Sequence, residues 1–259
     1  MAGETLKTLE KALQVLRVFS REDPELTVAE IARRVGASRT AITRILVTLE
    51  QGGYLERAPN GLKYRIGLAA CEVGALYLIG NPLLSLAEEQ LRKLADVSGY
   101  TSYLGRLYGD EVVILGVREG RLPIRFLWSA GDRLPAATTA TGKAMLMHLP
   151  RAEIDAIFGA GGDLAGLTPG SLRTRAELDR QLEESRPRGW VPMVEESFAG
   201  ICGVGAAIVG PDGRPVAGIS LSFLGSGFDE EEFGRSGALV VEAAREISNK
   251  LKTHSNYRS

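Results

Sequence analysis

The sequence is poor in cysteine and histidine, with 2 of each among 259 residues. Two cysteines, Cys71 and Cys202, exclude a disulfide framework and a multi-cysteine zinc site. Two histidines exclude a His-rich metal centre, so we expect neither a metal nor a cofactor. No stretch approaches the ~18 consecutive apolar residues of a membrane span, and the first residues lack the pattern of a signal peptide. The sequence therefore predicts a soluble cytoplasmic protein without membrane contact.

Apolar and charged residues are present in ordinary amounts, at 44% and 24%, with a net charge of -1. This composition is typical of a globular protein and excludes a disordered chain. The charge is unevenly distributed, because residues 1–70 hold 11 Lys and Arg against 8 Asp and Glu, whereas residues 71–259 hold 20 against 24. The net positive charge of residues 1–70 indicates that the N-terminal part binds a polyanion.

The first part of the chain has the signals of a helix-turn-helix. Apolar spacing predicts a helix over residues 5–20, and Thr27 with Glu30 forms a capping box that starts a second helix. Gly36 suits the left-handed position that ends this helix. Ser38 can cap a third helix that runs to about residue 51. Two short helices joined by a turn containing glycine are typical of a helix-turn-helix.

The third helix combines a buried Ile/Leu stripe with a polar face that holds Arg39, Thr40, Thr43 and Arg44. Recognition helices place such residues at base edges in the major groove, where arginine pairs with guanine. A hairpin follows, turning at Asn60-Gly61, and a hairpin in this position is a wing. The predicted DNA-contacting residues are Thr27, Ser38, Arg39, Thr40, Thr43, Arg44, Lys63 and Arg65.

Two other interpretations of this segment stay open. The polar face can be simply solvated, or the helix-turn-helix can contact a protein instead of DNA. The salt dependence of DNA binding separates these cases, because phosphate contacts give a steep negative slope.

The remaining chain predicts an apolar helix over 67–81 and then a mixed domain. The apolar helix is either a core helix or a linker that is covered by a dimer partner. The domains are expected at 1–66 (winged helix-turn-helix), 67–81 (linker helix) and 82–259 (effector binding and oligomerisation). In the last domain we predict helices at 83–97, 144–149, 151–158, 175–186 and 230–251, and strands at 101–108, 112–118, 124–128, within 194–209, and at 215–223. Helices that flank a mostly antiparallel sheet make an α+β fold.

Two patterns in this domain invite a reading as an enzyme. Gly142-Lys143 resembles the end of a phosphate-binding loop, but the glycine needed at 137 and the Ser or Thr needed at 144 are both alanine. The segment is therefore only a run of small residues before a helix. Ser220 or Ser222 could serve as the nucleophile of a hydrolase, but neither lies in a G-x-S-x-G elbow. Glu195-Glu196 is expected in a solvated turn, because adjacent strand residues point to opposite faces. We therefore predict that the protein is not an enzyme.

Over about residues 6–252 the chain resembles the IclR family of transcriptional regulators. The matching stretches are KALQVLRVFS, LTVAEIARRVGASRTAITRILVTLEQGGYLER, GLKYRIG, LPAATTATGKAMLMHLP, RPRGW, EESFAGICGVGAAIVGPDGRPVAGISLSF and AAREISNKL. The resemblance implies a winged helix-turn-helix, a linker helix and a C-terminal effector domain similar to the GAF fold. It also implies dimers, often paired into tetramers, that bind operator DNA, respond to a small organic effector and can contact RNA polymerase.

The resemblance further implies which residues line the effector cavity. They are Ile124, Phe126, Ala140, Thr141, Gly142, Met193, Gly200, Ile201, Gly203, Ser220 and Ser222. Two positions depart from the family pattern. The family's cysteine position falls on Gly203, and Cys202 is one residue early, which on a strand turns its side chain to the other face. An acidic position falls on Met193, which favours an apolar or aromatic effector over a small hydrophilic keto acid.

Overall fold

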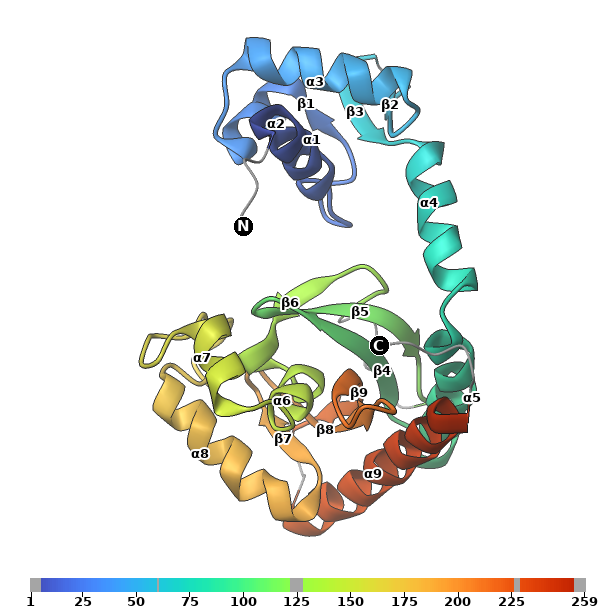
Figure 1. The fold of residues 1–259 in the computed structure, drawn as a ribbon, viewed down its shortest axis with the longest axis vertical. Coiled ribbons are helices and arrows are strands. Elements are labelled where there is room, and N and C mark those ends of the chain that lie inside the picture. The colour runs from blue at the N-terminus through green and yellow to red at the C-terminus, as the bar shows by residue number, and fades with distance from the viewer. Residues whose placement is uncertain (1–5, 60, 122–127, 226–228, 254–259) are drawn as a thin grey trace. The chain divides into compact units, whose positions relative to one another are not determined.

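The computed structural model describes residues 6–59, 61–121, 128–225 and 229–253. Their contacts divide the chain into two compact units, residues 1–81 and 82–259. Figure 1 colours the first unit blue to cyan and the second green to red. We describe each unit by itself.

The N-terminal unit packs three helices against a small antiparallel sheet of order β1-β3-β2. Its elements are α1 (Lys7–Arg17), β1 (Leu26–Thr27), α2 (Val28–Val35), α3 (Arg39–Gln51), β2 (Leu55–Arg57), β3 (Lys63–Ile66) and α4 (Leu68–Ile79). Val15, Ile31, Ile42, Leu46 and Tyr64 form its core, each at most 1% exposed. The predicted helix-turn-helix and wing are confirmed.

Local signals explain where these helices begin and end. The Thr27 side chain accepts from the backbone N–H of Glu30, and the Glu30 carboxylate accepts from the N–H of Thr27, so the predicted capping box is present. Gly36 adopts φ +68°, the left-handed conformation that favours glycine. The Ser38 hydroxyl accepts from the N–H of Ala41 and starts α3. Thr27 and Glu30 therefore set the start of α2, and Gly36 and Ser38 set the turn between α2 and α3.

The C-terminal unit is an α+β layer structure around a six-stranded antiparallel sheet of order β6-β5-β4-β9-β8-β7. The fold class is thus as predicted. Its helices are α5 (Pro82–Ser98), η1 (Ala136–Thr138), α6 (Ala140–Leu146), α7 (Arg151–Phe158), α8 (Arg175–Ser185), η2 (Arg186–Arg188) and α9 (Glu230–Thr253). Its strands are β4 (Thr101–Tyr108), β5 (Glu111–Arg118), β6 (Arg133–Pro135), β7 (Val191–Val194), β8 (Ile201–Val209) and β9 (Pro215–Leu224).

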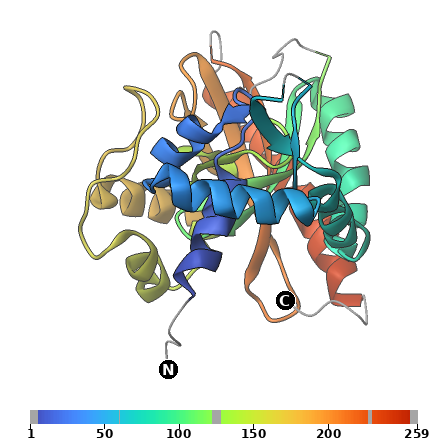
Figure 2. The same cartoon turned by 90° about the horizontal axis from the view of Figure 1, so that it is seen from above.

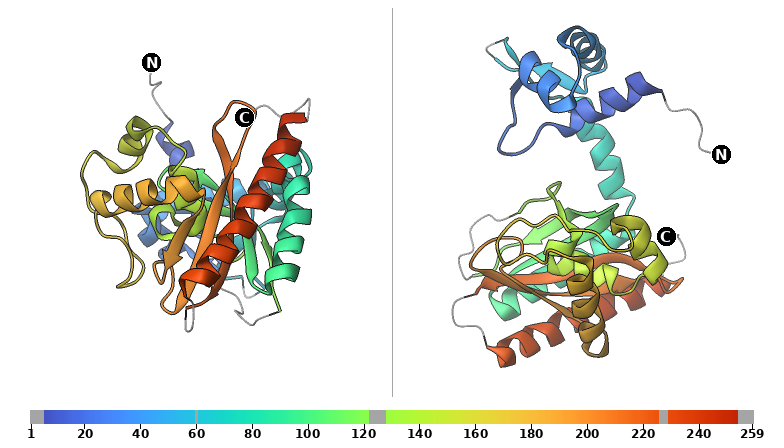
Figure 3. Two further views of the ribbon diagram at one scale, coloured as in Figure 1. Left: turned by 90° about the horizontal axis from the view of Figure 1, so that it is seen from below. Right: turned by 90° about the vertical axis from the view of Figure 1, so that its left-hand side faces the viewer.

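The two faces of this sheet carry different helices. The long helices α5 and α9 lie side by side on one face (Figure 3), where Gly116 of β5 faces Leu91 of α5. On the other face, Thr141 of α6 is hydrogen-bonded to Ser220 of β9. The sheet therefore separates an apolar helix layer from the short helix α6 that the sequence singled out.

The start of α6 differs from the prediction. The helix begins at Ala140, not at residue 144, because Thr139 caps it by accepting from the N–H of Gly142. Glycine disfavours a helix, so the sequence predicted that the helix starts after Gly142, but here the glycine is needed for packing. A Cβ on Gly142 would lie 2.3 Å from the carbonyl oxygen of Ala136. Of the predicted strand 124–128, Trp128 lies outside the strands and the rest lies outside the described residues.

No single helix in the described part of the chain is long and apolar enough to cross a membrane.

Candidate DNA-binding surface and effector site

Helix α3 presents the polar face that the sequence predicted. Arg39, Thr40, Thr43 and Arg44 are all exposed, whereas Ile42, Ile45 and Leu46 are buried. In Figure 2, α3 runs across the front of its unit with no other element of that unit drawn over it. At 100° per residue, Thr40 lies near the centre of the exposed face, and the two arginines lie on opposite sides of it. The face therefore carries Thr40, Thr43 and the exposed Val47 between Arg39 on one side and Arg44 on the other.

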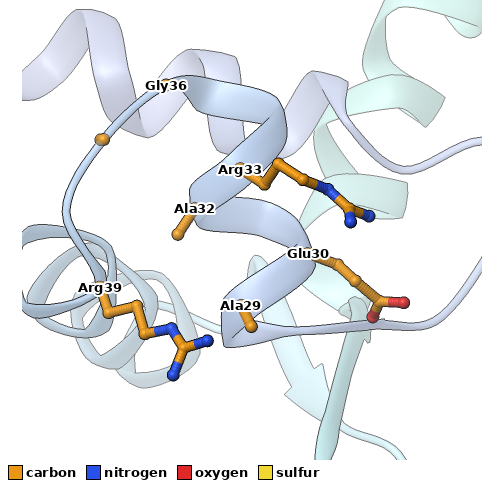
Figure 4. Close-up of a pocket in the computed structure, with 7 residues that line it drawn as sticks. Ala29, Glu30, Ala32, Arg33, Gly36 and Arg39 are labelled. Carbon is orange, nitrogen blue, oxygen red and sulfur yellow. The ribbon is translucent and has the colours of Figure 1, made fainter.

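The two arginines line different grooves. Arg39 lines a shallow groove of about 510 Å³ between α2 and α3. In Figure 4 its side chain reaches toward Ala29 at the start of α2, and Arg33 projects from α2 itself. Arg44 lines a groove of about 630 Å³ between α1 and α3, together with Lys7 and Lys11. The sequence analysis did not single out Arg33, Lys7 or Lys11, because only the packing of α1 and α2 brings these cations beside α3.

Three of the predicted hydroxyls are engaged within the unit. Thr27 and Ser38 serve as helix caps, as described above. The Thr43 hydroxyl donates to the carbonyl oxygen of Arg39 at 2.9 Å, and the residue is exposed. Thr43 can therefore contact a thymine methyl or accept a hydrogen bond, whereas the two caps act by positioning the helices.

The wing carries paired charges. Arg65 on β3 lies directly opposite Glu56 on β2, and its guanidinium is 2.6 Å from the carboxylate of Glu56. Lys63, on the same face of β3, is half-buried beside Thr27 of β1. Arg57 stacks over the Tyr64 ring and bonds the carbonyl of Gly61, which fixes the turn. A phosphate that approaches Arg65 must compete with Glu56.

In the C-terminal unit, the register places four of the candidate effector residues, Met193, Gly203, Ser220 and Ser222, in two rows across one face of the sheet. One row runs Met193, Gly203, Ser222, Thr101, and the next runs Val191, Gly205, Ser220, Tyr103, Val117. Directly opposite residues share a face, so Ser220 and Ser222 point the same way as predicted. The sequence analysis missed Thr101 and Tyr103, because the pairing of β4 with β9 is not visible in the sequence.

Helix α6 packs very closely on this face. The Thr141 and Ser220 hydroxyl oxygens are 2.8 Å apart. A Cβ on Gly205 would lie 2.4 Å from the carbonyl oxygen of Ala140, and one on Gly218 would lie 2.5 Å from that of Thr141. The glycines of β8 and β9 thus allow the backbone of α6 to pack directly on the sheet. Glycine in a strand often marks such close approach by another backbone or by a ligand.

The register also shows which face of the sheet the Cys202 side chain occupies. Cys202 pairs with Phe223, on the face opposite to Gly203, and it belongs to the core on the α9 side. Burial raises the pKa of its thiol. On the other face, the Met193 methyl lies 3.3 Å from where a Cβ on Gly203 would sit. An apolar side chain therefore occupies the place beside Gly203.

The expectation of a solvated turn is wrong for Glu196. Glu195 is exposed, but Glu196 is 2% exposed and receives two hydrogen bonds, of 2.5 and 2.7 Å, from the fully buried Lys143 of α6. Gln181 of α8 accepts a third hydrogen bond from Lys143, at 2.7 Å. Burial lowers the pKa of the Lys143 ammonium, and the Glu196 carboxylate opposes this shift. The pair ties α6 to the segment between β7 and β8.

Two further candidate effector residues, Gly200 and Ile201, lie at the entry to β8. Ile201 is buried next to the exposed Gly200, whose φ of +78° turns the chain into β8. Ile124 and Phe126 lie outside the described residues.

The two units match two family models. Residues 8–59 match the IclR helix-turn-helix domain, and residues 75–249 match the C-terminal domain of bacterial transcriptional regulator IclR. The HTH-type transcriptional regulator XynR of Escherichia coli is 30% identical over 95% of this chain and 97% of its own length.

Solved structures give the same result. The Thermotoga maritima IclR is 29% identical and superposes with a TM-score of 0.71, covering 96% of this chain and 100% of its own. An IclR homologue of Microbacterium hydrocarbonoxydans, complexed with 4-hydroxybenzoate, shares the fold at 22% identity and a TM-score of 0.77, covering 95% and 99%. These relatives are named regulators and not enzymes, in agreement with the non-enzyme prediction. The chain belongs to the IclR family of bacterial transcriptional regulators.

Proposed function

We propose that α3 enters the major groove of operator DNA with Thr40 and Thr43 facing the bases and Arg39 and Arg44 at the two edges of the contact. The observation that carries this proposal is the exposed polar face of α3, which is uncovered within its unit and bounded by cations on both sides. Arginine at such a position reads guanine or binds phosphate. Thr27 and Ser38 contribute by fixing the starts of α2 and α3.

The wing supplies phosphate contacts in this arrangement. Lys63 and Arg65 lie on one face of β3, and Arg33 adds a cation on the neighbouring α2. Each cation that neutralises a phosphate releases counterions, so the affinity falls with salt. In this proposal the regulator acts in the cytoplasm at promoter DNA, where it excludes or contacts RNA polymerase.

Helix α4 points to a second copy of the chain as partner. It is apolar, yet none of its residues is buried, and Leu68, Leu76 and Ile79 are 69 to 84% exposed. An apolar helix of this kind requires a cover. Two copies joined through α4 form a symmetric dimer, which carries two α3 helices for two half-sites of DNA. Pairs of such dimers form tetramers.

The effector binds, in this proposal, on the sheet face that holds Ser220, Ser222 and Met193. The Met193 side chain makes this face apolar beside Gly203, so an apolar or aromatic effector suits it. The related protein complexed with 4-hydroxybenzoate supports an aromatic class. The effector changes DNA affinity by binding two arrangements of the dimer unequally, with a coupling of about 1–3 kcal/mol.

Single substitutions on α3 test the DNA contact. Arg39→Ala and Arg44→Ala should each lower the affinity for a duplex selected by the purified protein from random sequences, by about 1–3 kcal/mol. Fluorescence anisotropy at several salt concentrations measures both the affinity and the salt slope. The matched control is Arg34→Ala, an exposed arginine of α2 that is already paired with Asp23; it should change the affinity little.

The result that contradicts the proposal is equally specific. If both α3 variants bind as the wild type does while remaining folded by circular dichroism, the major-groove assignment of α3 is wrong. If the protein shows no salt-dependent binding to any duplex, the alternative that this unit contacts a protein is favoured.

A further inference from the structure

Backbone hydrogen bonds join the end of α3 to the start of α4. The N–H of Tyr54 donates to the carbonyl oxygen of Leu49 in α3 at 2.9 Å, and the carbonyl oxygen of Tyr54 accepts from the N–H of Gly67 at 2.8 Å. The N–H of Ala69, in the first turn of α4, donates to the carbonyl oxygen of Gly53 at 3.1 Å. One short turn of chain after α3 therefore holds both helices.

The same bonds continue the pairing of the wing strands. Leu55 of β2 lies opposite Ile66 of β3, and the bond between Tyr54 and Gly67 is formed by the next residues along the two strands. The first N–H groups of a helix have no partner within it, so the bond from Ala69 satisfies one of them. Figure 1 shows α4 leaving its unit beside the ends of β2 and β3. The wing and the start of α4 thus form one hydrogen-bonded structure.

Close approach, and not backbone conformation, requires glycine at position 67. The φ of -95° and ψ of 170° at Gly67 are extended, and any residue adopts them. A Cβ on Gly67 would lie 2.3 Å from the carbonyl oxygen of Gly53 and 3.0 Å from the carbonyl carbon of Leu55. Since ordinary contacts of a Cβ begin near 3.4 Å, a side chain here requires the turn and α4 to separate by about 1 Å.

Within its unit, α4 is held mainly through its first turn. Gly67 is buried and Ala69 and Ala70 are half-buried, whereas every later residue of the helix except the half-buried Ala75 is exposed. Strand β2 is the main element of the unit that α4 contacts. The direction of α4 relative to α3 is therefore set at the junction around Gly67.

A displacement at this junction is amplified along α4. The helix has 12 residues, so it is about 18 Å long, and its first turn measures about 5.4 Å. A displacement of about 1 Å across the first turn tilts the helix by about 10° and moves its far end by about 3 Å relative to α3. Successive base pairs of DNA are about 3.4 Å apart. A methyl group on Gly67 thus corresponds to about one base pair in the placement of α3.

We propose that Gly67 is a positioning residue that makes α3 and α4 one rigid body and thereby sets the spacing between the two half-sites that a dimer reads. The inference rests on the proposed function, because it takes α3 as the DNA contact and α4 as the contact between two copies. In a symmetric dimer the same tilt applies to both copies, so the distance between the two α3 helices changes. Gly67 acts through the placement of α3 and not by contact with DNA.

The test varies the spacing of the half-sites and uses the full chain. The duplex selected by the wild type is remade with one or two base pairs removed or added between its half-sites, and a further duplex keeps a single half-site. Gly67→Ala should bind the selected duplex at least about tenfold more weakly, because avidity is lost when both half-sites cannot be engaged together. Its affinity for the single half-site should stay within about twofold of the wild type. Its preferred spacing should be one of the altered ones.

Two other glycines of the same turn supply a control and a second variant. Gly52→Ala is the matched control, because its Cβ would make only ordinary contacts, at 3.5 Å or more, and its φ of -80° suits any residue. It should keep the affinity and the preferred spacing of the wild type. If Gly67→Ala fails to fold by circular dichroism, Gly53→Asn replaces it. Asparagine tolerates the φ of +71° at this position and would place its side chain against Ala69, which should also change the preferred spacing.

The outcomes distinguish this inference from the proposed function. If the wild type prefers one spacing and folded Gly67→Ala keeps that preference, the proposed function stands and the role of Gly67 is rejected. The role is equally rejected if Gly67→Ala loses affinity for the single half-site and for the selected duplex in parallel, since that loss indicates damage to the wing. If the wild type itself binds one half-site as tightly as two, the proposed dimeric contact fails, and this inference fails with it.

Discussion

The two units use their charged side chains in opposite ways. In the N-terminal unit the ion pairs Arg34–Asp23, Arg57–Glu50 and Arg65–Glu56 lie on the surface, where each partner is 32 to 48% exposed. In the C-terminal unit Lys143 and Glu196 form a pair that is withdrawn from water almost entirely. Exposed pairs contribute about 0–1 kcal/mol and exchange easily. A buried pair resists rearrangement, because either charge left alone is costly.

Exposed pairs suit a unit that is proposed to bind DNA, and a buried pair suits a unit that keeps its helices in place. In the proposed DNA contact, Arg65 must leave Glu56 for a phosphate, and a weak exposed pair permits this. The C-terminal unit instead keeps helix α6 fixed against its sheet. The Lys143–Glu196 pair, with Gln181 on α8, connects α6, α8 and the segment before β8. Ser171 donates to the carbonyl oxygen of Glu196 at 2.6 Å and holds the same segment from the other side.

Breaking the buried pair should give the largest effect. Lys143→Met leaves the Glu196 carboxylate buried without its cation, which should destabilise the C-terminal unit by about 3–5 kcal/mol. Both tryptophans, Trp128 and Trp190, lie in this unit, so tryptophan fluorescence in a urea titration reports its unfolding alone.

A double variant and a surface variant serve as controls. Lys143→Met combined with Glu196→Gln removes both charges and should recover part of the loss. Asp23→Asn breaks an exposed pair and should cost no more than about 1 kcal/mol in the N-terminal unit, measured by circular dichroism. Equal costs for the buried and the exposed pair would show that burial does not distinguish the two units.

The second effect, smaller and confined to alkaline pH, concerns Tyr103. Its pKa is raised from 10.0 to about 12 by burial. The unfolded chain then releases this proton at lower pH than the folded chain, so the stabilisation is complete below pH 10 and is lost as the pH rises toward 12. Two units of pKa correspond to about 2–3 kcal/mol.

The measurement is the free energy of unfolding of the C-terminal unit between pH 9 and 11.5. The decline should be shallower in Tyr103→Phe, which has no phenol to titrate. Tyr108, exposed near the other end of the same strand, provides the control, and Tyr108→Phe should keep the profile of the wild type. A Tyr103→Phe profile parallel to that of the wild type would show that Tyr103 is not the buried phenol that the fold places beside Trp128.

The contrast between the units also explains what the sequence could predict. In the N-terminal unit the signals are local: Thr27 with Glu30, Gly36 and Ser38 each act within three residues, and all were identified correctly. The polar face of α3 follows from helical periodicity alone. The fold class, the family and the order of the helices were therefore accessible from the chain itself.

In the C-terminal unit the decisive contacts are long-range. Lys143 and Glu196 are 53 residues apart, and Thr101 is opposite Ser222 only because β4 pairs with β9. The start of α6 was misplaced because Gly142 weakens a helix by propensity, while its close approach to Ala136 requires glycine. Such a site depends on strand register and helix packing, which a single sequence does not display.

The smallest expected effect tests how readily a surface pair exchanges its partner for DNA. Glu56→Gln removes the carboxylate that holds Arg65 and leaves the arginine free to bind phosphate. Since an exposed pair is worth about 1 kcal/mol at most, the affinity for DNA should rise by no more than about fivefold at low salt. The rise should shrink as salt screens the charges. Glu10→Gln removes an equal charge from α1, outside the wing, and separates the release of Arg65 from the change in net charge. If Glu56→Gln gains no more affinity than Glu10→Gln, Arg65 does not contact the DNA backbone, and the wing acts through its shape and through Lys63.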